Sequence, residues 1–326
     1  MTGELKDRLF ETGRLVLVSF AQIAFTQKPL QGVLVFLTIF LLAPFSALGA
    51  VIGAFVSVVW GTRFGQSVED RHSGQAGVDT IILGILWGGA LAQDLSMDWL
   101  FALALMACLS LQAPVGRLMA KLALPPLAVS ALLIAWISHG VFKTFSAHFW
   151  NHPGLLPFGN WGIVAAICLI AVAFFWRSWR GALLCAVAVV VAAFGSGWAL
   201  TELGAIGPAG LWAFSVAPAA FGVAGGYLSG TPLGLKGGVF AAALAAVVWL
   251  GWVFSPLALV LPPLLAPVFL GIWGALWLVL GAERSAVLNV PLMKTVDLIR
   301  STKAQGGKVT VLSGAVAVTP EPLPTD

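Results

Sequence analysis

The amino-acid sequence predicts an all-α polytopic membrane protein built from two related halves. Of its 326 residues, 60% are hydrophobic and 9% are charged, whereas soluble domains have about 25% charged residues. A bilayer core takes about 20 apolar residues per helical span, and the apolar stretches of this chain suffice for about ten spans. The composition therefore excludes a soluble globular protein.

Two short motifs occur once in each half of the chain. Residues 74–77 read GQAG and residues 207–210 read GPAG, while residues 124–127 and 261–264 both read LPPL. The two offsets, 133 and 137 residues, are nearly equal. In transporters with internal repeats, broken helices from the two repeats meet near the bilayer midplane and form the solute pathway. The motifs therefore predict a duplicated fold with a pathway between its halves.

Each half is expected to contain a short half-helix followed by five spans, separated by glycine, proline and polar residues. In the first half the half-helix is expected at 15–25 and the spans at 29–44, 48–60, 77–91, 99–111 and 122–141. In the second half a short irregular segment at 145–158 precedes spans at 162–176, 181–198, 211–228, 239–254 and 257–280. The predicted units are a charged amphipathic segment at the membrane surface (1–14), a first repeat (15–142), a second repeat (143–282) and a cytoplasmic tail (283–326).

The distribution of charge supports this number of spans. With ten spans both termini lie on one side of the membrane, and sixteen of the seventeen Lys and Arg residues fall on that side, Lys143 being the exception. Basic residues accumulate on the cytoplasmic side of membrane proteins. We therefore expect an integral protein of a bacterial-type cytoplasmic (inner) membrane, with both termini cytoplasmic.

The tail differs in composition from the rest of the chain. It contains charged residues, glycines and prolines, and residues 309–318 could form a short strand pair around Gly314. The tail is either mostly flexible or a docking segment that orders on a partner.

The sequence offers no evident site for enzyme chemistry. The three cysteines lie in apolar runs without disulfide or metal-site spacing, and no set of nucleophile, base and orienting group is recognisable. His148 and His152 are four residues apart, as on one helix face, but Pro153 opposes a regular helix there. We expect no cofactor, no metal, no nucleic-acid partner and no enzyme activity.

Several segments resemble urea transporters. Residues 22–32 (QIAFTQKPLQG) resemble the family's first half-helix, which leads through a turn into the first span. Residues 77–84 (GVDTIILG) resemble the family's Gly-Tyr-Asn-Ala-x-Leu-Val-Gly stretch, and residues 210–215 (GLWAFS) resemble its second copy, Gly-Leu-Trp-x-Tyr-Asn. The LPPL motifs stand where the family has its two Leu-Pro-x-x-Thr signatures. The resemblance covers roughly residues 15–282 and implies two inverted repeats, each with five spans and a half-helix, in a subunit that is usually part of a trimer.

The resemblance also identifies candidate pathway residues and departures from the family. Gln22 and Phe25 match the half-helix, and Asp79 and Ser215 stand at the two Asn positions. The Thr positions are occupied by Ala128 and Leu265, so the line of hydroxyl oxygens that serves urea is lost. His152 is a candidate counterpart of Gln22 in the second half.

Alternative roles remain open for some of these residues. Gln22 either lines the pathway or caps local structure. Asp79 is either a pathway or proton-linked group, since intramembrane carboxylates often are, or a cap of the third span with Arg71 as its partner. Flavin-carrying membrane subunits of sodium-pumping quinone reductases are similar in fold, but their Ser-Gly-Ala-Thr attachment motif ends here in Val316, so no flavin is expected.

Two functions are compatible with the sequence. The first is a passive channel of urea-transporter type for a small neutral solute, with membrane lipids around it and a homo-oligomeric assembly. The alternative is a non-transporting accessory or scaffold subunit that keeps the fold within a larger membrane complex, attached through its tail to partner subunits.

Overall fold

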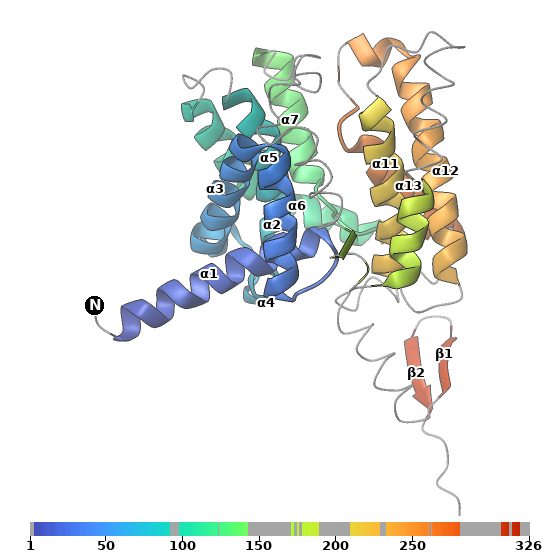
Figure 1. Cartoon of the computed structure of the whole chain (residues 1–326), viewed down its shortest axis with the longest axis horizontal. Helices are drawn as coiled ribbons and strands as arrows, with labels where there is room; N and C mark the ends of the chain where they lie inside the picture. The colour runs from blue at the N-terminus through green and yellow to red at the C-terminus, as the bar shows by residue number, and fades with distance from the viewer. Residues whose placement is uncertain are drawn as a thin grey trace, which may run out of the picture.

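Helices make up most of the described structure, a computed structural model (Figure 1). The first half contains α1 (Gly3–Ile23), α2 (Pro29–Leu42), α3 (Pro44–Trp60), a 3₁₀ turn (Gly61–Phe64), α4 (Val68–Ser73), α5 (Gln75–Leu91), α6 (Asp98–Lys121) and α7 (Val129–Phe142). The second half contains α11 (Ala209–Phe221), a π-helical turn (Gly222–Tyr227), α12 (Leu233–Val253), a 3₁₀ turn (Pro256–Leu259) and α13 (Ala266–Leu280). The structure describes residues 3–91, 98–122, 124–142, 171–172, 175, 178–188, 209–228, 233–259, 261, 263–280, 308–312 and 315–319.

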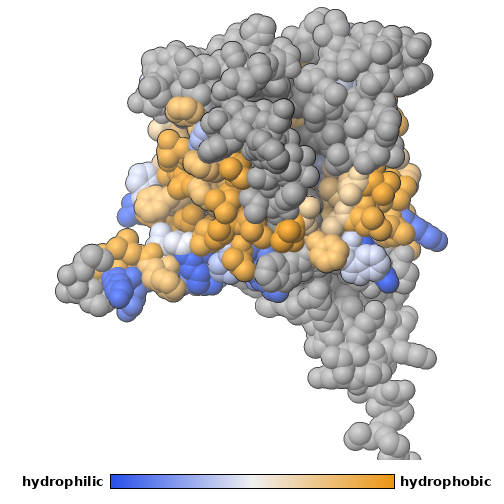
Figure 2. All heavy atoms as spheres, viewed as in Figure 1, coloured by the Kyte–Doolittle hydropathy of each residue, from blue (hydrophilic) through white to orange (hydrophobic). Residues whose placement is uncertain are grey.

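Three helical stretches among the described residues are long and apolar enough to cross a membrane: Pro44–Phe64, Trp99–Lys121 and Leu233–Val253. Five shorter apolar helices accompany them. Apolar residues form a band across the molecule, with hydrophilic residues along its lower border (Figure 2). The fold is therefore a helical membrane protein, while the ten spans, their inverted arrangement and the domain boundaries remain predictions. The expected segment 145–158 and most of 162–176 lie outside the described residues.

Several predicted helix limits differ from the structure. Helix α6 (Asp98–Lys121) ends ten residues beyond the expected span 99–111, and α12 (Leu233–Val253) begins six residues before the expected span 239–254. Residues of the surface segment 1–14 and of the half-helix 15–25 form one helix, α1 (Gly3–Ile23), which continues through Gly13. The expected spans 122–141 and 257–280 are each interrupted at the LPPL motif. Two consecutive prolines lack N–H donors and disfavour the helical backbone in the preceding residue, so a helix cannot continue through them.

The two LPPL motifs adopt the same local structure. Leu127 and Leu264, the last residues of the motifs, have left-handed backbones with φ of 46° and 42°. The N–H of Val129 donates to the Pro126 carbonyl, and that of Ala266 donates to the Pro263 carbonyl. Each turn leads directly into a helix, α7 or α13. The equal conformations, 137 residues apart, agree with the duplication that the motifs predict.

The crossing of α3 and α5 relies on glycines. Gly49 and Gly53 on α3, and Gly84 and Gly88 on α5, each recur at a spacing of four residues. A Cβ atom on any of these glycines would collide with the backbone of the facing helix. Small residues at this spacing let transmembrane helices approach closely, so these two helices form a rigid pair in the first half.

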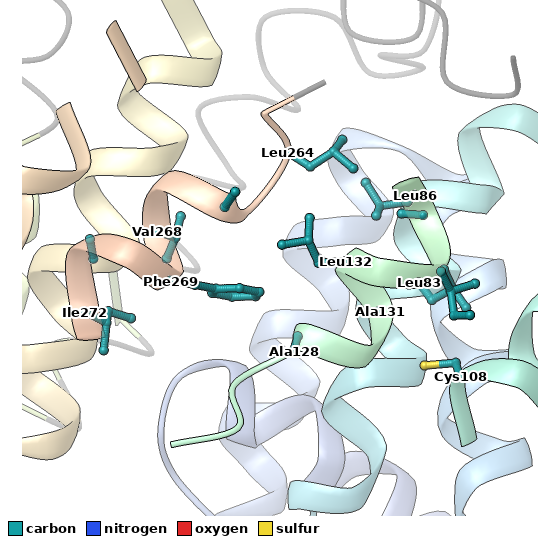
Figure 3. Packing of buried hydrophobic residues seen from close by; sticks show 14 of the residues in the cluster. Leu83, Leu86, Cys108, Ala128, Ala131, Leu132, Leu264, Val268, Phe269 and Ile272 are labelled. Atoms are coloured by element: carbon teal, nitrogen blue, oxygen red, sulfur yellow. The ribbon is translucent and has the colours of Figure 1, made fainter. Parts of the chain in front are cut away.

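One apolar core joins the two halves. Its buried members include Leu83, Cys108, Ala128 and Leu132 from the first half, and Leu264, Val268, Phe269 and Ile272 from the second. Figure 3 shows Phe269 of α13 pointing toward α7, which carries Leu132 and which Ala128 immediately precedes. The interface between the halves is thus lined by the helices that follow the two LPPL motifs.

The tail contains the strand pair that residues 309–318 predict. Strands β1 (Lys308–Leu312) and β2 (Ala315–Thr319) pair antiparallel, with Lys308 opposite Thr319 and Leu312 opposite Ala315. Whether the tail docks on a partner remains a prediction.

Candidate functional site

Phe25 lies where α1 ends and contacts the second half. The helix closes with a C-terminal motif in which the Thr26 N–H donates to the Ala21 carbonyl and the Phe25 N–H donates to the Gln22 carbonyl. Phe25 takes the left-handed position of this motif, with φ of 53°, a position that usually belongs to glycine. Its ring lies 6.1 Å from that of Phe221 and 5.7 Å from that of Tyr227, between ring centroids. The strained backbone therefore presents this aromatic ring to the opposite half.

The surface that receives Phe25 is the π-helical turn after α11. Pro218 removes a backbone donor within α11, and three glycines occupy the turn that follows it. A Cβ atom at Gly226 would lie 2.8 Å from Cδ1 of Phe25, and one at Gly222 would lie 3.3 Å from its Cζ. The glycines thus make room for the ring. Single π-helical turns often mark functional positions in helices.

Gln22 is tied to the first half by a hydrogen bond. Its Nε2 atom donates to the Ser73 carbonyl at 2.6 Å, at the end of α4. This bond satisfies a carbonyl that the helix end leaves without an intrahelical partner. The local contact matches the capping role considered for Gln22, and its place in a pathway remains a prediction.

Ala128 and Leu265 occupy corresponding places at the starts of α7 and α13. The Leu132 N–H donates to the Ala128 carbonyl at 3.1 Å, and the Phe269 N–H donates to the Leu265 carbonyl at the same distance. Ala128 is buried, and Leu265 packs against the shared core. Neither side chain has an oxygen, and Leu132 and Phe269, one helical turn later, are apolar as well. This part of the interface between the halves, called here the waist, is therefore apolar.

Two tryptophans that the sequence analysis overlooked connect the halves. The Trp273 Nε1 atom on α13 donates to the Pro125 carbonyl of the first LPPL motif at 2.9 Å. Trp136 on α7 stacks on Trp252 of α12, with ring centroids 5.6 Å apart and planes 23° apart. Trp136 and Trp273 are themselves 137 residues apart. The repeat offset, applied beyond the two motifs, would have identified them.

Asp79 lies against the start of α7. The backbone of Ala131 and the side chains of Gln112 and Ser130 surround its carboxyl group. Asp79 is 8% exposed and Ser130 is 1% exposed. The Oδ1 atom of Asp79 and the Oγ atom of Ser130 have no hydrogen-bond partner. A helix N-terminus stabilises a carboxylate through its free N–H groups and its dipole, so the position accommodates the acid.

Arg71 does not pair with Asp79. Its guanidinium donates to the Val58 carbonyl at the end of α3. The ion pairs formed between described residues do not include Asp79. The idea that Asp79 caps the third span with Arg71 as its partner is therefore corrected: the carboxyl group faces the N-terminus of a different helix, α7.

A polar network lies next to Asp79 and ties four segments of the first half together. The Ala76 carbonyl on α5 accepts hydrogen bonds from Ser57 Oγ at 2.9 Å, Gln112 Nε2 at 3.1 Å and Gln66 Nε2 at 3.3 Å. Gln66 also donates to Gln112. Because polar groups in a dry interior need partners, this network fixes α6 against α3 and α5 beside the carboxyl group.

Two further candidate residues are Ser215 and His152. Ser215 is buried on α11, with 1% exposure. His152 lies outside the described residues, so its alignment with Gln22 remains a prediction. In the part of the chain that the structure describes, no three His, Cys, Asp or Glu side chains gather in a group able to hold a metal ion.

The comparison with protein families supports the resemblance. Residues 10–157 match the family model described as urea transporter, a range that contains most of α1, the Asp79 position and the first LPPL motif. A search of curated proteins gives no significant match. Over residues 10–157, the chain is therefore similar to the urea transporter family.

Proposed function

We propose that this protein is a passive urea-transporter-like channel whose solute is small, neutral and less polar than urea. Members of the urea transporter family are channels and not enzymes, and the match over residues 10–157 supports the same class here. The pathway would run between the two halves, past Phe25 and then past the waist formed by Ala128, Leu132, Leu265 and Phe269.

The apolar waist is the observation that supports a solute other than urea. A polar group that leaves water without a new partner costs several kcal/mol, on the order of 2–7. Urea has one carbonyl and two amide groups, and the family's threonine hydroxyls would replace their water. With Ala128 and Leu265 at those positions, a solute with fewer hydrogen-bonding groups crosses at lower cost.

Asp79 and Ser130 would supply the polar contact that remains near the waist. The Asp79 carboxyl group would accept a hydrogen bond from the solute, and the Ser130 hydroxyl would donate one. A single amide group offers the matching donor and acceptor. Simple amides such as acetamide and formamide are therefore the first solutes to examine.

Stopped-flow measurements on proteoliposomes test this proposal. We expect acetamide or formamide to enter proteoliposomes faster than empty liposomes. The rate of urea entry should increase by a smaller factor. The Ala128→Thr variant restores one hydroxyl and should raise urea permeability relative to acetamide. Ala102→Thr on the exposed face of α6 is the matched control and should change neither. Folded protein that accelerates none of urea, acetamide, formamide, ammonia and glycerol would contradict the channel.

The second candidate function is a non-transporting subunit of a larger membrane complex. Two observations favour it: the core that fills the interface between the halves, and the paired strands β1 and β2 in the tail, which offer an attachment. In that case no solute would be accelerated, and deletion of residues 308–319 would release a copurifying membrane partner while leaving the helical part folded.

A further inference from the structure

The first turns of α1 extend away from the helix bundle. Figure 1 shows α1 running across the base of the first half, with its N-terminal part beyond the other helices. Three large apolar side chains on this part are exposed: Leu5 at 46%, Leu9 at 56% and Phe10 at 76%. Basic residues accompany them at positions 6, 8 and 14. This combination is typical of helices that lie in a membrane interface.

A cavity opens between this helix and the bundle. It has a volume of about 470 Å³ and lies between α1, the end of α3 and α4. Asp7, Arg8 and Glu11 of α1 line it on one side, and Arg71 of α4 lines it on the other. Leu15 and Val58 contribute apolar wall.

The charged groups of the cavity have opposite signs. Arg71 is held in place by the Val58 carbonyl, and its Nε atom is buried without a hydrogen-bond partner. The Glu11 side chain accepts two hydrogen bonds from Arg14, at 2.6 and 2.8 Å, and these lower the pKa of Glu11 from its ordinary value. Glu11 is therefore ionised at neutral pH. An occupant of this cavity meets guanidinium and carboxylate groups within one space.

We propose that this cavity binds the headgroup of a zwitterionic phospholipid with a primary ammonium group, of the phosphatidylethanolamine type. Arg71 and Arg8 would bind the phosphate, as guanidinium groups bind phosphate oxygens well. Asp7 and Glu11 would accept hydrogen bonds from the ammonium, while Leu15 and Val58 would contact the apolar part of the lipid. A choline headgroup has no N–H to donate, and a glycerol headgroup has no positive charge. The four charges therefore favour the ethanolamine lipid over both.

The site depends on the chain lying in a membrane and not on what it transports. Lipid retention is measured without any solute. Failure of the channel proposal therefore does not contradict the lipid proposal, and failure of the lipid proposal does not contradict the channel.

Lipid retention by the full-length protein tests the proposal. The protein is reconstituted in nanodiscs of equal parts phosphatidylethanolamine, phosphatidylcholine and phosphatidylglycerol, re-extracted in mild detergent, and its bound lipids are counted by native mass spectrometry. We expect phosphatidylethanolamine to be enriched over each competitor by about fivefold, the factor that one hydrogen bond of typical net strength supplies. The Asp7→Asn variant removes an acceptor for the ammonium and should reduce this enrichment. Arg71→Gln removes a contact to the phosphate, which all three lipids share, and should reduce the retention of each.

Controls keep the result interpretable. Arg117→Gln removes an exposed charge from α6, away from the cavity, and should leave the enrichment unchanged. Arg71 also donates a hydrogen bond to the Val58 carbonyl, so loss of its side chain affects the fold as well as the cavity. Asp7 is exposed, so the Asp7→Asn variant tests lipid binding without this effect. Equal retention of the ethanolamine and choline lipids, preference for phosphatidylglycerol, or enrichment that survives Asp7→Asn would each overturn the proposal.

Discussion

At the scale of single residues, Asp79 is distinguished by its burial. It is the one acidic side chain among the buried residues of the described structure, and its alignment with an Asn of urea transporters remains a prediction. Its carboxyl group faces the start of α7, immediately after the waist residue Ala128. The sequence indicated that Asp79 is unusual, but not which helix it faces, because that depends on how α5 and α7 pack.

Two substitutions at Asp79 distinguish the contribution of its hydrogen-bond acceptors from the contribution of its negative charge. Asp79→Asn keeps an acceptor for the Ala131 N–H and should melt close to the wild type. Asp79→Leu leaves that N–H and Gln112 without this partner, at a cost of about 1–3 kcal/mol per buried group, and should lower the melting temperature in detergent. If Asp79→Asn is as unstable as Asp79→Leu, the negative charge itself is what the site requires.

Trp273 supplies a donor to a carbonyl in a broken helix. Within a membrane such a carbonyl needs a protein partner, and the indole provides it across the two halves at 2.9 Å. Trp273→Phe should therefore destabilise the fold by about 1–3 kcal/mol, read as a lower melting temperature. Trp60→Phe changes an exposed tryptophan, at 43%, and is the control. Equal melting of both variants would show that the hydrogen bond contributes little.

At the scale of elements, the apolar stretches and the glycine, proline and polar residues between them predicted most of the helices in the described part of the first half. The expected spans 29–44, 48–60 and 77–91 correspond closely to α2, α3 and α5. One error concerned the LPPL motifs, because apolar residues on both sides of each motif made the two helices look like one span. Another concerned α1, in which the charged segment and the apolar half-helix are continuous. The left-handed backbone at Leu127 and Leu264 results from packing. The apolar sequence around these two residues does not predict it.

The α3–α5 pair makes a prediction of its own. Gly84→Ala puts a methyl group against the Gly49 carbonyl, and such overpacking typically costs about 1–3 kcal/mol. A Cβ atom at Gly251 on α12 has nothing within 4 Å, so Gly251→Ala should be neutral or slightly stabilising, because alanine favours helix. Thermal melting in detergent compares the two. A neutral Gly84→Ala variant would mean that these helices are not tightly packed.

At the scale of the whole molecule, the sequence predicted a duplicated chain whose halves meet at broken helices. The described residues agree where they can be compared: the two LPPL turns, the residues Ala128 and Leu265 that follow them, and the tryptophans nine residues beyond each turn. The solute could not be predicted from the motifs, because selectivity depends on which side chains line the interface. Phe221 and Tyr227, which receive Phe25, belong to no motif and were missed for the same reason.

The ratio of acetamide to urea permeability, measured by stopped flow in proteoliposomes of wild type and Ala128→Thr, tests the central claim most directly. An apolar waist predicts a wild-type ratio above that of empty liposomes, and a ratio that falls in the Ala128→Thr variant because the added hydroxyl serves urea. Urea permeability equal to that of acetamide in the wild type, unchanged by Ala128→Thr, would contradict the account.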